Sequence, residues 1–359
     1  MLKKIDLYII KKFLGTYFLS IVLIISISVV FDLTEKLDNF FENNAPLKAI
    51  IFDYYLNFIP YYANMFTPLF TFISVIFFTS KMATNTEIIA ILASGVKFSR
   101  MLWPYFVSAT IITLFSFFLT GYVIPPANKV RLNFEDEYVR KFKNEVARNI
   151  QFEIKEGTIV YIERYEEERK QGYRFSMESF EDDKRLSSRM IANRIEWKSD
   201  STWVVKDYLI RTFDGLYESI VQGEKMDTII PMDPAEFFIT AKQAPEMSNP
   251  QLKEYIKKQE KRGAANIQAF KDEYYKRFSY PLASFILTLI GVSLASRKVK
   301  GGMGLHLGIG IGLSAAFILF STISSTFAIK GTMSPLLAVW LPNIVFLVIG
   351  IALYQRAPK

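Results

Sequence analysis

The sequence of 359 residues contains no cysteine and only one histidine. The lack of cysteine excludes disulfide bonds, thiolate metal ligands and a thiol nucleophile. A single histidine excludes clusters of imidazole ligands and most forms of histidine-based acid–base catalysis. That histidine, His306, begins an apolar segment, where a packing or interfacial role is the simpler interpretation. We therefore predict no catalytic residue, no metal site and no cofactor.

The short motifs of common nucleotide-binding and hydrolytic enzymes are also missing. There is no G-x-x-x-x-G-K-[ST] loop, no G-x-S-x-G elbow and no H-E-x-x-H helix. The acidic clusters at 166–168 and 181–183 fall in predicted turns, where solvated loops explain them better than a metal site. No basic stripe runs through the polar part of the chain, so nucleic acid is not an expected partner.

Acidic residues are unevenly distributed, and none follows Glu273. Between Pro126 and Glu273, 26 Lys and Arg stand against 28 Asp and Glu, so the rest of the chain carries a charge of +10. Mean hydropathy is +0.19 and 51% of residues are hydrophobic, which is too apolar for an ordinary soluble protein. The sequence therefore predicts a polar domain (126–273) inserted between two apolar blocks (1–125 and 274–359).

Six apolar runs are long enough to cross a bilayer, which takes about 20 helical residues. They are Phe13–Phe31, Phe58–Ser80, Met101–Ile124, Phe278–Ser296, Leu305–Ile329 and Pro335–Tyr354. The first is expected to be a retained span and not a signal peptide, because its apolar stretch is too long and no small-x-small cleavage site follows it. Ala49–Tyr62 reads as an amphipathic helix that runs into the second span.

The orientation follows from the distribution of Lys and Arg. Twelve lie in the N-terminal segment, the 81–100 and 297–300 loops and the C-terminal segment, against three in the short loops on the other side. Because cytoplasmic loops are enriched in basic residues, both termini are predicted in the cytoplasm and the inserted domain outside it.

The inserted domain shows alternation of period two from Ile150 to Ile230, which predicts six or seven antiparallel strands. Either one face is a core and the other is solvated, or the interior of an open roll is itself a binding groove. Ser248-Asn249-Pro250 then starts a helix that Gly263 ends, and a second helix from Asn266 leads into the fourth span.

A short helix is predicted at 84–95, within the cytoplasmic loop. Thr84 and Glu87 fit a capping box, and Gly95 fits a left-handed C-terminal cap. Its apolar stripe has no partner within its own loop. The helix therefore either lies in the lipid interface or couples to a groove in a soluble subunit.

The fifth span carries glycines at intervals of four, Gly304, Gly308 and Gly312. Overlapping GxxxG patterns let a second helix approach closely. They serve either packing within the bundle or a movable seam facing a partner helix.

Basic residues gather near the outer ends of the spans. They either anchor the helix ends or contact phosphates of an anionic lipid. The residues are Lys36, Lys129, Arg131, Lys276 and Arg277.

In two local patterns and their order, the chain resembles the lipopolysaccharide-export permease family, the YjgP/YjgQ proteins also called LptF and LptG. Residues 86–95, TEIIAILASG, are similar to the family's coupling-helix segment. Residues 252–256, then Gly263, Arg277 and 281–283, are similar to the helix pair before its fourth span. Residues 160–164, VYIER, look closer to the LptG branch. One departure is that Asp32 and Glu35 precede Lys36, where family members often carry a basic residue.

The resemblance implies six transmembrane helices with an inserted periplasmic, all-β, jellyroll-like domain in the inner membrane of a Gram-negative bacterium. It implies a permease subunit of an ATP-binding-cassette exporter of lipopolysaccharide, with no nucleotide site of its own. The implied partners are a second permease subunit, a cytoplasmic ATPase dimer and a periplasmic jellyroll bridge protein. The first and fifth spans, with the glycines above, would form a lateral gate. ATPase coupling would fall to Glu87, Ile88, Ile91, Leu92, Ala93, Ser94 and Gly95.

Three other functions stay open from the sequence alone. One is a membrane-anchored adaptor whose β-domain binds a periplasmic protein. Another is a permease for a different lipid or for a lipoprotein. A membrane-embedded enzyme is disfavoured, since the spans contain almost no ionisable groups.

Overall fold

The computed structural model describes residues 3–139, 146–181, 185–263, 267–297 and 302–357. They form two compact units. The helical unit takes the chain up to Val139, then 244–250, and then the chain from Gln268 onward. The second unit takes the remaining residues up to Ile267 and contains the inserted sheet.

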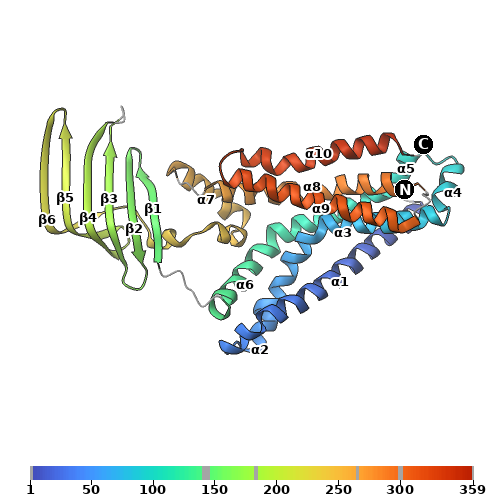
Figure 1. Cartoon of the computed structure of the whole chain (residues 1–359), viewed down its shortest axis with the longest axis horizontal. Coiled ribbons are helices and arrows are strands. Elements are labelled where there is room, and N and C mark those ends of the chain that lie inside the picture. Colours follow the sequence, from blue (N-terminus) through green and yellow to red (C-terminus); the bar gives the residue numbers. More distant parts are fainter. Residues whose placement is uncertain (1–2, 140–145, 182–184, 264–266, 298–301, 358–359) are drawn as a thin grey trace. The chain divides into compact units, whose positions relative to one another are not determined.

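The helical unit contains six helices that are long and apolar enough to cross a membrane (Figure 1). Each contains one of the six predicted spans, apart from the last residue of the fourth run, so the predicted number and order are confirmed. The predicted helix at 49–62 does run without a break into the second span, through a short π-helical stretch. The six are α1 (Lys4–Glu42); α2, η1 and α3 (Leu47–Ala49, Ile50–Tyr55, Leu56–Thr84); α5, η2 and α6 (Phe98–Phe118, Leu119–Val123, Ile124–Tyr138); α8 (Ile267–Ala295); α9 (Gly302–Ile329); and α10 (Pro335–Gln355).

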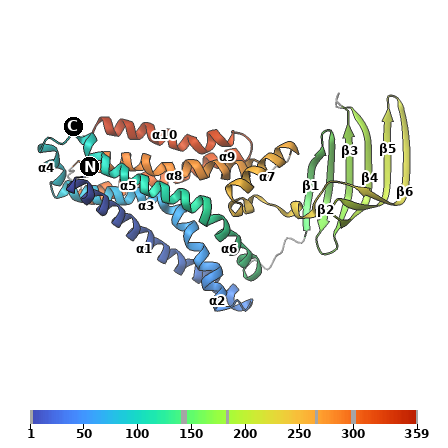
Figure 2. The same cartoon turned by 180° about the vertical axis from the view of Figure 1, so that it is seen from behind.

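The helical bundle has two distinct ends. The N-terminus, the C-terminus and the short helix α4 (Glu87–Ala93) lie together at one end, here called the terminal end (Figure 2). The α1–α2 turn, the α9–α10 turn and the end of α6 lie at the other, called the insert end because the chain passes from it into the inserted unit.

The second unit is built on one six-stranded sheet with the strand order β1-β2-β3-β4-β5-β6. Each strand pairs antiparallel with the next one in sequence. The predicted all-β insert between the third and fourth spans is confirmed, with six described strands in a meander. They are β1 (Val146–Lys155), β2 (Thr158–Glu166), β3 (Gln171–Phe180), β4 (Leu186–Ser199), β5 (Thr202–Asp214) and β6 (Tyr217–Ile229), followed by η3 (Pro234–Phe238), η4 (Ala241–Glu246) and α7 (Asn249–Lys261).

One face of the sheet is buried, as the alternation predicts. Ile162, Phe175 and Trp203 are fully buried there. Phe237 of η3 stacks on Trp203, with ring centroids 6.2 Å apart, and so covers this face. Met226 of β6 still packs against this core, but the cover does not reach Val221, which pairs with Ile210 of β5 and is 53% exposed. The apolar face therefore continues uncovered beyond the packed core.

Candidate functional site

The short helix α4 is the first candidate element, and its N-terminus differs from the prediction. The helix begins at Glu87 after Thr86, which has a φ of +61° and makes no side-chain cap. Thr84 instead donates its hydroxyl to the carbonyl of Ser80. The predicted capping box is therefore wrong, because Glu87 occupies the first helical position and not the third. The left-handed cap at Gly95 is confirmed by its φ of +84°.

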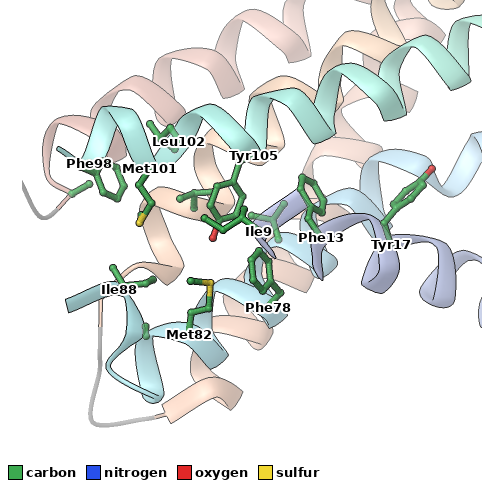
Figure 3. Close-up of a cluster of buried hydrophobic side chains, with 14 of the residues drawn as sticks. Ile9, Phe13, Tyr17, Phe78, Met82, Ile88, Phe98, Met101, Leu102 and Tyr105 are labelled. Atoms are coloured by element: carbon green, nitrogen blue, oxygen red, sulfur yellow. The ribbon is translucent and has the colours of Figure 1, made fainter. Parts of the chain in front are cut away.

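The apolar stripe of α4 is turned toward the bundle. Ile88 is 1% exposed, and Ile91 and Leu92 pack partly buried against the same cluster. Figure 3 shows this cluster, to which α1, α3 and α5 contribute side chains around Met82 and Met101. The partner that the loop lacks thus comes from the same chain.

The opposite side of α4 is open. Ile89, Ala90, Ala93 and Ser94 are exposed on it. Apart from Ile89, these are small residues, which allow another surface to approach the helix backbone closely. Ile88 could reach another protein only if α4 moved away from the bundle.

Glu87 connects α4 to the first helix. Its carboxylate accepts a hydrogen bond from the Tyr8 hydroxyl at 3.2 Å, and Asn85 donates to its other oxygen at 3.2 Å. Tyr8 lies in the second turn of α1, 79 residues earlier in the chain. Sequence analysis missed this contact because it joins segments whose approach depends on helix packing.

A second link at the terminal end joins α1 to α5. Arg100 donates two parallel hydrogen bonds, of 2.8 and 2.6 Å, to the Asp6 carboxylate. Asp6 is 1% exposed and also accepts the backbone N–H of Lys3. The sequence feature that could have indicated this ion pair is Asp6, an acidic residue within an otherwise basic N-terminal segment. Together the two links hold the start of α1 against both α4 and α5.

The glycines of α9 divide between two faces. A Cβ added at Gly304, Gly308 or Gly312 would meet nothing within 4 Å, whereas one at Gly310 would run into Ile76 of α3. α9 therefore packs on α3 through Gly310 and leaves the predicted glycine stripe uncovered.

His306 lies on the packed side of α9. It is 4% exposed, and its Nδ1 is 2.9 Å from the hydroxyl of Ser80 on α3. This geometry agrees with a packing role, as the sequence predicted.

Two of the predicted basic residues share one network at the insert end. Lys36 lies 2.7 Å from Asp32, 3.5 Å from Glu135, and within hydrogen-bond reach of Tyr54. Arg131 pairs with the same Glu135 at 2.9 Å. Of the two acidic residues that depart from the family pattern, Asp32 thus holds Lys36 in this chain.

Arg277 is engaged inside the helical unit. It is 4% exposed, and its donors reach Glu273, the carbonyls of Ala244 and Met247, and the side chain of Asn249 at 2.8–3.1 Å. It therefore holds the 244–249 segment against α8.

The other two cations are more accessible. Lys276 pairs with Asp272 at 2.7 Å, with 38% of its side chain exposed, and Lys129 is exposed. The five predicted lipid-contact residues thus differ in availability: four are paired with acidic residues of the chain, whereas Lys129 is exposed.

The chain from residue 7 to residue 356 matches the family described as lipopolysaccharide export system permease LptF/LptG. Comparison with curated proteins gives no match. The matched region includes the inserted sheet and nearly all of the six long helices. Permeases of this family are transmembrane subunits of an ATP-binding-cassette transporter whose ATPase is a separate subunit, LptB. With its six apolar helices and inserted antiparallel sheet, the chain belongs to the LptF/LptG family of lipopolysaccharide export permeases.

Proposed function

We propose that this permease converts ATPase movement into lipopolysaccharide extraction through α4. The observation that carries the proposal is the two-sided character of this helix. One side is buried in the bundle through Ile88, and the other is open along Ala90 and Ala93. A helix seated in this way transmits a push on its open side to the helices behind it.

The Glu87–Tyr8 hydrogen bond supports a route from α4 to α1. Between Phe18 and Phe31, α1 exposes most of its apolar side chains, so its middle is not held by the chain's own helices. A displacement of α4 would therefore be expressed as a tilt of α1, which is the helix that the family resemblance assigns to a lateral gate.

The open glycine face of α9 is proposed to meet the second permease subunit. Gly304, Gly308 and Gly312 present backbone without a covering side chain. Close helix approach of this kind is the main use of such stripes in membranes. We also propose that both termini lie in the cytoplasm, as the distribution of Lys and Arg predicts. The insert end and the sheet would then lie on the periplasmic side.

The uncovered apolar face near β6 is proposed to receive acyl chains of lipopolysaccharide. Val221 and Ile210 lie on the face that, farther along the sheet, forms the core. β6 is one of the two edge strands of the described sheet, where its pairing partner is β5, so its other side would dock the bridge protein by strand addition. Of the five predicted cations, the exposed Lys129 is proposed to contact lipid phosphates.

A single-cysteine experiment tests the coupling role directly, because the chain has no cysteine of its own. Ala90→Cys is expected to crosslink to the ATPase subunit in membranes, while Lys48→Cys at the insert end is not. A membrane-impermeant maleimide added to intact spheroplasts is expected to label Lys48→Cys only. Crosslinking at neither position, in a complex that retains the ATPase, would remove α4 from the coupling interface.

The conduit role of the sheet needs its own test. A photoreactive residue at Ile210 or Val221 is expected to capture lipopolysaccharide during export, and one at Tyr161 on the opposite face is not. A scan of the inner face that captures no lipid would favour an adaptor role for the domain. Capture of a different lipid would reassign the substrate. The LptG assignment stays a prediction, because the family match covers both branches.

A further inference from the structure

A cavity of about 320 Å³ lies within the helical unit, toward its insert end. It is walled mainly by residues of α3, α8, α9 and α10, with Thr120, Ile124 and Pro245 completing the lining, so it forms within one permease and needs no second subunit. Its volume falls in the range of small-molecule sites and far exceeds the space taken by a single water. None of the roles proposed above uses it.

Asn343 of α10 is the most informative residue of this cavity. It is 4% exposed, and its Nδ2 donates to the carbonyl of Ser279 on α8 at 2.8 Å. Its Oδ1 is buried and accepts no hydrogen bond from any described residue. A buried acceptor left unpaired is destabilising, because the loss of its hydrogen bonds to water is not compensated. This position is therefore built to receive a hydrogen-bond donor.

The charged residues of the cavity also favour a ligand that carries donors. Arg277 uses its guanidinium on Glu273 and on the 244–249 segment, so its charge is already engaged. Glu273 accepts Arg277 through Oε1, and its side chain is 27% exposed. Its second oxygen makes no hydrogen bond with the described part of the chain. The cavity thus offers a carboxylate and an amide oxygen to a positively charged donor.

The remaining lining suits a lipid and not a freely soluble cation. Lys276 lies one turn from Glu273 on α8 and pairs with Asp272 at 2.7 Å, but 38% of its side chain is exposed, so that it can also meet a phosphate. Phe317, Ile318 and Val339 add apolar side chains to the lining. A cation, an anion and apolar side chains together match the headgroup and upper chains of a zwitterionic phospholipid.

We propose that this cavity binds the headgroup of an aminophospholipid such as phosphatidylethanolamine. The primary ammonium donates hydrogen bonds to Asn343 Oδ1 and is neutralised by Glu273, and Lys276 faces the phosphate. The site is separate from the export path proposed above. It would hold α8, α9 and α10 together through a lipid supplied by the surrounding bilayer.

Lipid retention measured by native mass spectrometry tests the site. The full chain is reconstituted in nanodiscs with equal amounts of phosphatidylethanolamine, phosphatidylcholine and phosphatidylglycerol, extracted in mild detergent and weighed with its retained lipid. We expect the ethanolamine lipid to be retained about fivefold over the choline lipid, whose quaternary ammonium cannot donate. That ratio corresponds to one hydrogen bond of about 1 kcal/mol.

Two cavity variants and one control complete the experiment. Asn343→Leu removes the acceptor, and Ser321→Phe adds a bulky side chain to the cavity lining from α9 while leaving Asn343 and Glu273 unchanged. Both are expected to reduce the preference to about one. Thr288→Val, at a buried hydroxyl outside the cavity lining, is expected to leave it unchanged.

The following results would contradict the proposed lipid site. Equal retention of the ethanolamine and choline lipids, or preference for the glycerol lipid, would show that no ammonium donor is recognised. An unchanged preference in Ser321→Phe would place the retained lipid elsewhere, even if Asn343→Leu failed to fold.

Discussion

The Tyr8 hydroxyl donates a hydrogen bond of 3.2 Å to the carboxylate of Glu87, so the first spanning helix and α4 are in direct contact. Close to this contact, Asp6 and Arg100 join α1 to α5. The terminal end of the bundle therefore has two polar links on one helix. One reaches α4, which is open to a partner, and the other reaches a second spanning helix.

Glu87→Lys is expected to abolish lipopolysaccharide export while the protein still folds. The substitution replaces the carboxylate that accepts the Tyr8 hydroxyl with a cation. Because position 87 is only half-buried, water can solvate the lysine and the protein is expected to fold. Glu87→Gln keeps an acceptor for Tyr8 and is expected to retain part of the activity. Export in proteoliposomes with the partner ATPase measures the effect, with thermal unfolding as the folding control. Normal export by a well-folded Glu87→Lys variant would contradict the coupling role of Glu87.

Arg100→Ala is expected to destabilise the protein more than Asp6→Ala. The first leaves the carboxylate of Asp6, only 2% exposed, buried without its partner. The second leaves Arg100, 38% exposed, which water can reach. We expect Arg100→Ala to lower the free energy of unfolding by more than Asp6→Ala does. Denaturant unfolding in detergent micelles gives both values, and the reverse order would contradict the burial argument.

Gly310→Leu and Gly308→Leu are expected to have different consequences. At position 310 a side chain meets the fully buried Ile76, and overpacking of this kind costs roughly 1–3 kcal/mol. At position 308 nothing lies within 4 Å. Gly308→Leu should therefore leave the melting temperature unchanged and weaken only the association with a second permease. Size-exclusion chromatography of co-expressed subunits separates the two effects; equal destabilisation by both variants would refute the two-face assignment.

The stability of the helical unit is expected to fall as the pH rises from 5 to 8 because of Glu246. Burial, with the nearby charge of Asp136, raises the pKa of Glu246 from 4.5 to about 7. An acid with a raised pKa in the folded state contributes stability below its unfolded pKa and loses it as the pH rises through the folded pKa.

Glu246→Gln should remove this part of the pH dependence and stabilise the protein at pH 8 by roughly 1–2 kcal/mol. Melting temperatures at pH 5.5 and 8 measure it. As a matched control, Glu254→Gln should leave the slope with pH as it is in the unmodified protein. If the melting temperature of Glu246→Gln fell with pH as steeply as that of the unmodified protein, Glu246 would be excluded as the source of the pH dependence.

Much of the architecture was predictable because it depends on local composition. A span needs about 20 apolar residues, and a strand alternates apolar with polar residues. Both patterns can be read without knowing what lies nearby. The end of α7 was also predictable, since Gly263 adopts a φ of +59° that other residues rarely take.

The candidate sites were only partly predictable. The sequence singled out the 84–95 segment and the glycines of α9. It could not say that Ile88 is covered by the bundle, nor that Gly310 packs while Gly308 does not. The capping box at Thr84 failed because Thr84 continues α3 and bonds to Ser80, one turn earlier in that helix.

The sequence by itself determined the six apolar helices, the inserted sheet and the absence of cysteine chemistry. Only the tertiary structure decided which side chains are available. Lys36 and Arg277 look like free cations in sequence, yet one is held by Asp32 and the other by the 244–249 segment. The physical reason is that ion pairs and buried acceptors, such as that of Asn343, arise between helices whose relative rotation local patterns do not specify.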